Sequence, residues 1–165
     1  MLFATLSTIF LSALALTSPT PNIHPRQAYN ITFTVTNFTA FMADPYIEGT
    51  QSNLSFHVVD PRPKYYTEVD CVIPPTYFSL YAITALYEYC GNHSLNFMFL
   101  FEDGEVSISR GWTDDAGNSF TASGSLNPYW NENGPSANVT VTPTGKLYTR
   151  KSAWMFPVNR LQKNG

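Results

Sequence analysis

Charged side chains are scarce in this 165-residue sequence, and their signs nearly balance. Asp, Glu, Lys and Arg make up 13% of the residues, and the formal net charge is −3. Proteins that bind nucleic acids carry an excess of Lys and Arg that neutralises phosphates, so the composition indicates no nucleic-acid partner. The sequence also has little of the Ala, Glu, Lys and Leu bulk of helical proteins. Thr, Ser, Asn, Tyr and Phe are frequent instead, which favours strands and turns.

Long apolar runs are missing after the first sixteen residues. Residues 2–16 read LFATLSTIFLSALAL, and no charged side chain precedes His24 and Arg26. The run is too short to span a bilayer comfortably, so we predict a signal peptide over residues 1–18, with Ala13-x-Ala15 as an acceptable cleavage site. A membrane anchor is the alternative. The mature protein is then expected to be secreted, extracellular and without a membrane span.

A proline-rich linker or short pro-segment is predicted over residues 19–29. Within it, Arg26-Gln27 is either a processing site or an ordinary solvated charge. The length of the chain fits one domain. We place this domain at residues 30–143 and a basic, aromatic C-terminal tail at residues 144–165.

The domain consists of short runs in which apolar and polar residues alternate, the pattern of half-buried strands. The run from Ile31 to Phe41 switches its apolar side near Asn37, which predicts a bulge. Further strands are expected at residues 54–58, at 65–73 (ending at Pro74-Pro75), at 120–124 and at 138–142, while residues 77–90 fit either a strand or a helix. This spacing predicts an all-β fold, a single compact antiparallel β-barrel or sandwich.

A central hairpin is the clearest element. Asp103-Gly104 is a two-residue turn, because both positions tolerate the positive φ that such turns need. Folding residues 95–113 about this turn pairs Phe99 with Ile108 and Phe97 with Arg110 on one apolar face. Two further apolar residues fall on the opposite face, Met98 and Leu100. They need a cover, which either another part of the chain or a homodimer would supply.

The prediction of secretion bears on the two cysteines and the five glycosylation sequons, because disulfides and N-glycans are features of secreted proteins. Cys71 and Cys90 are the only cysteines. In a secreted chain they predict one disulfide, with two buried free thiols as the alternative. Asn-x-Ser/Thr sequons, which permit N-glycosylation, begin at Asn30, Asn37, Asn53, Asn92 and Asn138. Asn92 is the best candidate because it follows Cys90-Gly91 in an expected turn.

Catalytic and metal-binding patterns are weak. The histidines, His24, His57 and His93, have no nucleophile motif beside them, and neither they nor the cysteines have zinc-site spacing. We therefore expect no metal, no other cofactor and no catalytic residue. Glu68 and Asp70 share one strand face, as glycosidase carboxylates would, but solvated charges are the commoner meaning of such a pair.

Four residues are candidates for contact with a partner. Arg110 lies on the apolar face of the hairpin, where it is either an anchor for an anion or partner or an arginine stacked on neighbouring rings. Arg150, Lys151 and Trp154 belong to the tail, which has no acidic residue after Glu132. This tail either holds an anionic partner such as a cell-wall polymer or folds back and covers the body with its aromatic residues.

The order of several motifs resembles small secreted fungal proteins typified by the major Alternaria allergen. The resemblance spans about residues 30–142 and consists of NFTAF at 37–41, SNLSF at 52–56, Cys71, Tyr89-Cys90, NFMF at 96–99 and SISRGW at 107–112. It implies a β-barrel, secretion, a tendency to dimerise and an allergen-like or effector-like role. It also implies binding of a host plant defence protein or a small phenolic ligand. Family members often carry a second cysteine pair, which this chain lacks.

The function expected from these observations is binding of a host protein or small ligand, without catalysis. A secreted carbohydrate-active or other hydrolytic enzyme is one alternative, and a carrier of a small apolar ligand is another. A binder needs an exposed aromatic patch, an enzyme needs polar groups that converge in a cleft, and a carrier needs an unfilled interior.

Overall fold

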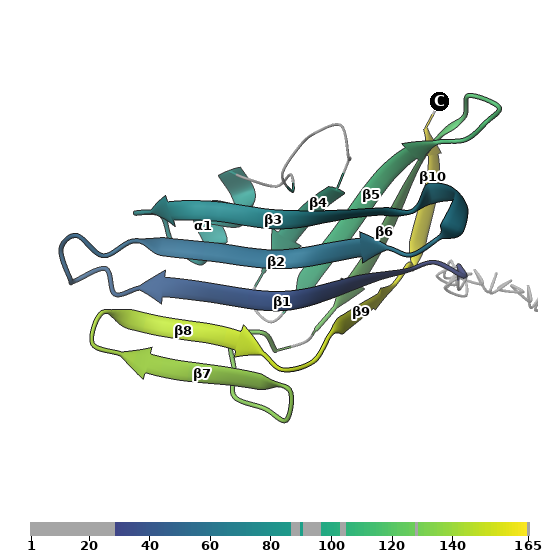
Figure 1. Ribbon diagram of the computed structural model, residues 1–165. Helices are drawn as coiled ribbons and strands as arrows, with labels where there is room; N and C mark the ends of the chain where they lie inside the picture. The colour runs from purple at the N-terminus through teal and green to yellow at the C-terminus, as the bar shows by residue number, and fades with distance from the viewer. Residues whose placement is uncertain (1–28, 87–89, 91–96, 103–104, 128, 165) are drawn as a thin grey trace, which may run out of the picture.

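The computed structural model describes residues 29–86, 90, 97–102, 105–127 and 129–164. They form two antiparallel sheets that pack face to face (Figure 1). The all-β prediction is confirmed, and of the two predicted forms the sandwich is the one observed, because neither sheet closes into a barrel. The predicted signal peptide lies outside the described residues, as does all of the predicted linker except residue 29.

Sheet A is built around its central strand β1. The strand order is β3-β2-β1-β8-β7, and β9 also pairs with β1. Its strands are β1 (Thr32–Ala43), β2 (Ser52–Asp60), β3 (Thr67–Thr76), β7 (Ala137–Thr142), β8 (Gly145–Arg150) and β9 (Trp154–Pro157).

Sheet B contains the predicted hairpin. Its order is β10-β6-β5-β4, with β4 (Phe97–Phe101), β5 (Val106–Thr113), β6 (Ser119–Leu126) and β10 (Arg160–Asn164). Phe99 pairs with Ile108 and Phe97 with Arg110, so the predicted register is confirmed. The Asp103-Gly104 turn itself lies outside the described residues. β6 continues the meander at residues 119–126, as the alternation at 120–124 predicted.

The predicted bulge in β1 is also observed. The register with β2 shifts between Thr36 and Thr39, and Asn37 has a φ of 54°. Asparagine tolerates this left-handed conformation better than most residues. On one side of the bulge β1 pairs with β9, and on the other side it pairs with β8.

The third strand and the ambiguous segment differ from their predicted forms. A short 3-10 helix η1 (Pro63–Tyr65) precedes β3, which begins at Thr67 and continues through Pro74-Pro75 to Thr76. Prolines are tolerated there because β3 is an edge strand, where one side needs no backbone donor. Part of the ambiguous segment is the helix α1 (Leu80–Leu86), and the side-chain oxygen of Ser79 caps it by accepting a bond from the Ala82 amide.

The segment predicted as a C-terminal tail, residues 144–165, is part of both sheets. β8 and β9 pair with β1, and β10 pairs with β6. The chain passes from sheet A to sheet B at Val158 and Asn159, whose amides donate to the carbonyls of Ile31 and Ser123. The boundary placed at residue 143 therefore does not separate a tail from the domain, and the fold-back alternative describes the structure.

Aromatic side chains fill the space between the sheets. Phe33 meets Phe97 edge to face, and Phe56 meets Phe99 in the same way. Phe38 touches Phe101 from the opposite sheet, Trp154 on β9 and Trp130 in the loop before β7. The interior is thus a packed aromatic core, which gives no support to an interior carrier site.

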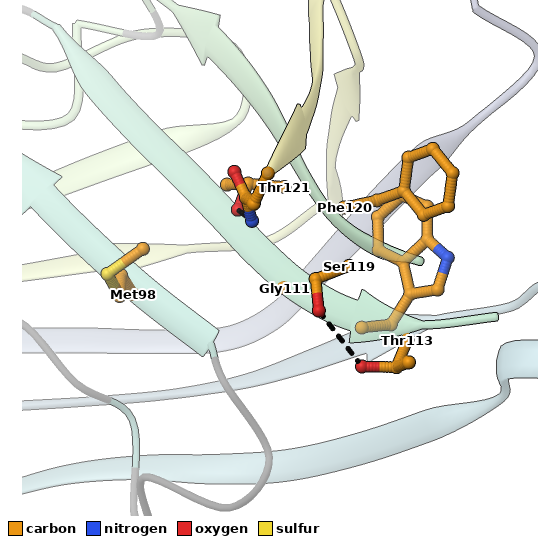
Figure 2. A pocket seen from close by; sticks show the side chains of 8 residues that line it. Met98, Gly111, Thr113, Ser119, Phe120 and Thr121 are labelled. Atoms are coloured by element: carbon orange, nitrogen blue, oxygen red, sulfur yellow. Dashed lines mark hydrogen bonds between the residues drawn. The ribbon is translucent and has the colours of Figure 1, made fainter. Parts of the chain in front are cut away.

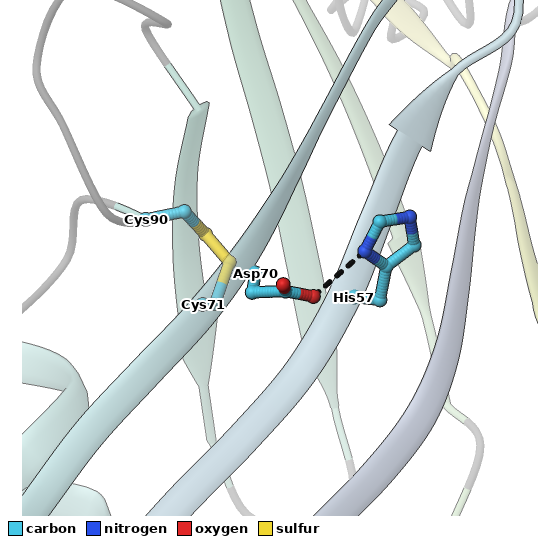
Figure 3. The surroundings of a disulfide bond; sticks show 4 residues. All are labelled: His57, Asp70, Cys71 and Cys90. Carbon is cyan, nitrogen blue, oxygen red and sulfur yellow. Dashed lines mark hydrogen bonds and ion pairs between the residues drawn. A yellow bond between two sulfur atoms is a disulfide. The ribbon is translucent and has the colours of Figure 1, made fainter.

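A disulfide closes one side of the sandwich. Cys71 on β3 and Cys90, which follows α1, form a disulfide with sulfur atoms 2.02 Å apart (Figure 3). The Cys90 amide donates to the carbonyl of Phe97 on β4. The bond therefore connects the edge of sheet A to a segment beside the edge of sheet B, and the predicted cysteine pairing is observed.

Candidate functional site

The largest of the hollows described here lies where β1 turns into β2. It has a volume of about 550 Å³, within the usual range for ligand sites. We call it the aromatic cleft. Its walls are the end of β1, the loop 44–51, the start of β2 and the segment before α1, and its lining residues are Met42, Ala43, Asp44, Pro45, Ile47, Glu48, Gly49, Thr50, Ser52, Tyr77, Ser79 and Tyr81. In Figure 1 this is the end of the sandwich on the left.

Exposed aromatic rings lie in the cleft and next to it: Tyr77 and Tyr81 line it, and Tyr46 lines a hollow that adjoins it. Tyr46, on the loop, is 95% exposed, and Tyr77, on the facing segment, is 76% exposed. Phe78 and Tyr81 are also among the exposed large hydrophobic residues. Most exposed large hydrophobic residues occur singly on protein surfaces, so two exposed rings that line one hollow, with a third on the loop that also lines it, are a feature that needs a functional explanation.

Hydrogen bonds hold the loop wall of the cleft in place, and a ring contact holds the other wall. The Asp44 side chain accepts a bond from the Tyr46 amide, and the Asp44 amide donates to Thr144 in the turn between β7 and β8. The hydroxyl of Ser52 accepts a bond from Ala43 across the base of the loop. On the other wall, Tyr81 packs against the buried ring of Trp130, with ring centres 6.0 Å apart. The cleft therefore has preformed walls.

The charges along the cleft are of one sign. Its ionisable lining residues, apart from tyrosines, are Asp44 and Glu48. A second hollow of about 340 Å³ shares Met42 to Pro45 with the cleft and carries Lys146 on its far side. On β8, burial and, to a smaller degree, Tyr81 raise the pKa of the Tyr148 hydroxyl above its ordinary value.

A smaller hollow of about 300 Å³ lies on sheet B near the turn between β5 and β6 (Figure 2). Met98, Gly111 and Thr121 line it, together with Trp112, Thr113, Ser119, Phe120 and Asn164. Its hydroxyl groups bond to neighbours: Thr113 with Ser119 and Asn164 with Thr121. None of the eight lining side chains is an acid or a base at neutral pH. This hollow can therefore offer hydrogen bonds and ring contacts but no proton transfer.

A buried ion cluster lies at the opposite end of sheet A. Asp60, which is 0% exposed, pairs with Arg110 of sheet B and with both Nε and Nη2 of Arg62. Burial alone would raise the pKa of Asp60, but the hydrogen bonds and charges of the two arginines hold it below its usual value. Burial also lowers the pKa of Arg110, and Asp60 opposes this effect. The Arg62 guanidinium lies over the Trp112 ring, 4.0 Å from its centre.

The predicted carboxylate pair lies on the outer face of sheet A. The His57 Nδ1 atom is 2.8 Å from Asp70 Oδ1 (Figure 3). The Nε2 atom of the same ring is 3.7 Å from Glu68 Oε2. Both carboxylates are exposed. These three residues line none of the hollows described above. Their arrangement favours solvated charges around a histidine over a glycosidase centre.

The four predicted partner-contact residues do not share one surface. Arg110 is buried with Asp60 and lies 5.5 Å from the centre of the Phe97 ring, so the stacked-arginine alternative describes it. Trp154 is buried against Phe38. The Arg150 guanidinium lies over the Trp154 ring, and burial lowers its pKa. Lys151 is exposed. As a group they form no contact surface, because two of them belong to the core.

The sequons differ in accessibility. Asn30, Asn37 and Asn138 have exposed side chains, Asn53 is partly buried on β2, and Asn92 lies outside the described residues. Whether any carries a glycan stays a prediction. Among the described residues, no group of three His, Cys, Asp or Glu side chains could hold a metal ion. The same part of the chain contains no helix of the length and apolarity that crossing a membrane requires.

Sequence reasoning did not find the aromatic cleft. Its walls come from the loop 44–51 and the segment 77–81, which are separated by the 25 residues 52–76 and carry no recognised motif. Asp44-Pro45 and Glu48-Gly49 mark a turn-rich loop, but strand alternation says nothing about which loops meet. A search for tyrosines in expected loops would have identified Tyr46, whereas Tyr77 begins the segment that fits either a strand or a helix.

Comparison with protein-family models, with curated proteins and with solved structures found no match. The candidate site is therefore assigned from its geometry alone.

Proposed function

We propose that the chain is a secreted, effector-like binding protein that holds a host protein or small ligand at the aromatic cleft. The observation that carries this proposal is the pair of exposed rings, Tyr77 and Tyr81, that line a hollow of about 550 Å³, with the exposed Tyr46 in the hollow that adjoins it. Secretion is supported by the apolar N-terminal run and by the disulfide between Cys71 and Cys90.

The chemistry of the cleft suits recognition. Tyrosine offers a large apolar face and one hydrogen-bonding hydroxyl, and it loses little conformational entropy on binding. The cleft adds small and hydroxyl-bearing neighbours at Gly49, Thr50 and Ser79, the residue types that accompany tyrosine in antibody binding loops. The resemblance to the Alternaria-allergen-like family supports the same kind of role, with a plant defence protein or phenolic compound as partner.

A capture experiment tests the proposal. The mature protein would be immobilised and exposed to plant apoplastic fluid and to a panel of phenolic compounds, beside a double variant Tyr46→Ala/Tyr77→Ala. The matched control is Tyr66→Ala, which also removes an exposed ring, at the start of β3 rather than beyond its end. We expect the double variant to lose a partner that the wild type and the control retain.

The proposal fails if the double variant, shown to be folded by its circular dichroism and thermal midpoint, retains every partner. Turnover of a polysaccharide or ester substrate by the wild type, lost on substitution of His57 or Asp70, would favour the hydrolase alternative instead. The predicted homodimer is a separate question. It stays a prediction that light scattering at micromolar concentration would decide.

A further inference from the structure

We infer that the aromatic cleft recognises a positively charged peptide segment, with a lysine or arginine side chain entering between the tyrosines. This inference rests on the proposed function and specifies the chemistry of the partner. Three features of the cleft support it: the sign of its charges, the rings beside those charges, and the absence of a competing cation among its described lining residues.

The charges that line the cleft are both acidic. Asp44 and Glu48 line it, and among the residues that the structure describes no Lys, Arg or His does. The two carboxylates differ in role, because Asp44 Oδ1 accepts the Tyr46 amide and so shapes the loop. Glu48 is exposed, and no ion pair found among the described residues engages it. Glu48 is therefore the carboxylate that is available to a ligand.

The rings supply a second attraction for a cation. A guanidinium or ammonium group over a tyrosine face is attracted by the negative face of the ring. This chain already places arginines in this way over its own rings, Arg62 over Trp112 and Arg150 over Trp154. At the cleft, Tyr77 and Tyr81 line the hollow and Tyr46 stands beside it. Among the described contacts, no cation of the chain lies over the Tyr46 or Tyr77 ring.

Lys146 is expected to oppose the effect of Glu48 on the binding of a cationic ligand. It is exposed and lines the adjoining hollow, which shares Met42 to Pro45 with the cleft. A cationic ligand in the cleft is repelled by Lys146 and attracted by Glu48. Loss of either charge leaves the backbone unchanged, since neither side chain makes a described hydrogen bond. An uncharged ligand such as an oligosaccharide would respond to neither charge in this opposed way.

The test measures binding of an acetylated and amidated penta-arginine peptide by calorimetry and by NMR shifts of the backbone amides. The matched probe is penta-citrulline, which has the same shape without the charge. We expect shifts centred on residues 44–50 and 77–81, and binding about tenfold weaker for citrulline. Raising the salt concentration should weaken the binding of the arginine peptide and leave the binding of the citrulline peptide unchanged.

Three variants complete the experiment. Glu48→Gln should lower the affinity for the arginine peptide about threefold, and Lys146→Gln should raise this affinity about twofold. Glu132→Gln, which removes an exposed charge from another hollow, should leave the affinity unchanged. Equal binding of the two peptides, equal effects of Glu48→Gln and Glu132→Gln, or preference for a neutral oligosaccharide would overturn the inference. These outcomes leave the proposed function standing if Tyr46→Ala/Tyr77→Ala still loses its partner.

Discussion

Asp60 and Arg110 form an ion pair through the interior that joins the end of β2 in sheet A to β5 in sheet B. Asp60 is fully buried and Arg110 is 8% exposed. Two charges removed from water are tolerated only when they are paired and hydrogen-bonded. Here Arg62 and the carbonyl of Tyr65 supply the further bonds. The pair therefore fixes how the two sheets meet at this end.

Asp60→Asn is expected to lower the free energy of unfolding by about 3–5 kcal/mol, because it leaves the Arg110 charge buried without a partner. Urea unfolding of the variant and the wild type measures the difference. Asp115→Asn is the control, since it removes the same charge from an exposed pair with Lys64 at the same end and should change stability little. Equal losses from the two substitutions would contradict a special role for the buried pair.

Acid should remove the contribution of Asp60. Its pKa in the folded protein lies below the ordinary value of 3.8, because the arginines outweigh the effect of burial. A group with a depressed folded pKa stabilises the fold fully above its unfolded pKa and loses this effect as the pH falls through the folded pKa. The stability gap between wild type and Asp60→Asn should therefore be constant above about pH 5 and shrink below about pH 4. A gap that widens on acidification would refute this account.

Local features of the fold were predictable from the sequence. The hairpin register followed from alternation about Asp103-Gly104, because a shift by one residue would expose its phenylalanines. The bulge near Asn37 followed from the switch in its apolar side, and the disulfide followed from the cysteine count. Each of these predictions depends on neighbours in sequence or on a single pair, so a pattern can specify it.

Long-range features were not predictable. β8 to β10 are short, with Pro157 and polar residues among them, and their partners β1 and β6 lie far away in sequence. Arg110 was recognised as unusual, but Asp60, fifty residues earlier, could not be paired with it. The aromatic cleft lies between the loop 44–51 and the segment 77–81, which the pairing of β2 with β3 brings together. Patterns in a single sequence do not show which distant segments lie side by side.

The disulfide should contribute measurably to stability. Cys71 and Cys90 are separated by 19 residues, and in the chain-entropy model closure of a loop of this length stabilises the fold by about 3 kcal/mol. A Cys71→Ala/Cys90→Ala variant is expected to lose about this amount in urea unfolding. Mass spectrometry of the alkylated, non-reduced wild type provides the direct check: two alkylated thiols would show that the bond does not form.

The C-terminal strands β9 and β10 should be essential for the stability of the fold. Phe156 on β9 is fully buried, whereas its neighbour Met155 is 53% exposed. Phe156→Ala is expected to cost about 3–5 kcal/mol because it opens a cavity in the core. Met155→Ala should lie within about 0.5 kcal/mol of the wild type. Deletion of residues 151–165 should abolish cooperative unfolding, because it removes both β9 and β10. A truncated chain that unfolds with the wild-type midpoint would restore the idea of a separate tail.

Gly124 should tolerate no side chain, because β9 crosses β6 there with its backbone in contact. A Cβ atom at Gly124 would lie 2.8 Å from the carbonyl oxygen of Pro157 and 3.1 Å from that of Phe156. Both neighbours are main-chain atoms of the strand that leads from sheet A to sheet B, so relief requires β9 to move away from β6. Gly124→Ala is expected to cost about 1–3 kcal/mol, the usual range for overpacking.

Gly134→Ala is the matched control, because nothing lies within 4 Å of the position that its Cβ would occupy. It should leave stability unchanged or raise it slightly, since alanine reduces the freedom of the unfolded chain. The thermal midpoints of the two variants, measured side by side, separate the effect of crowding from the loss of glycine as such. If both variants have the thermal midpoint of the wild type, the backbone of β9 does not contact β6 at Gly124 as closely as in the structure.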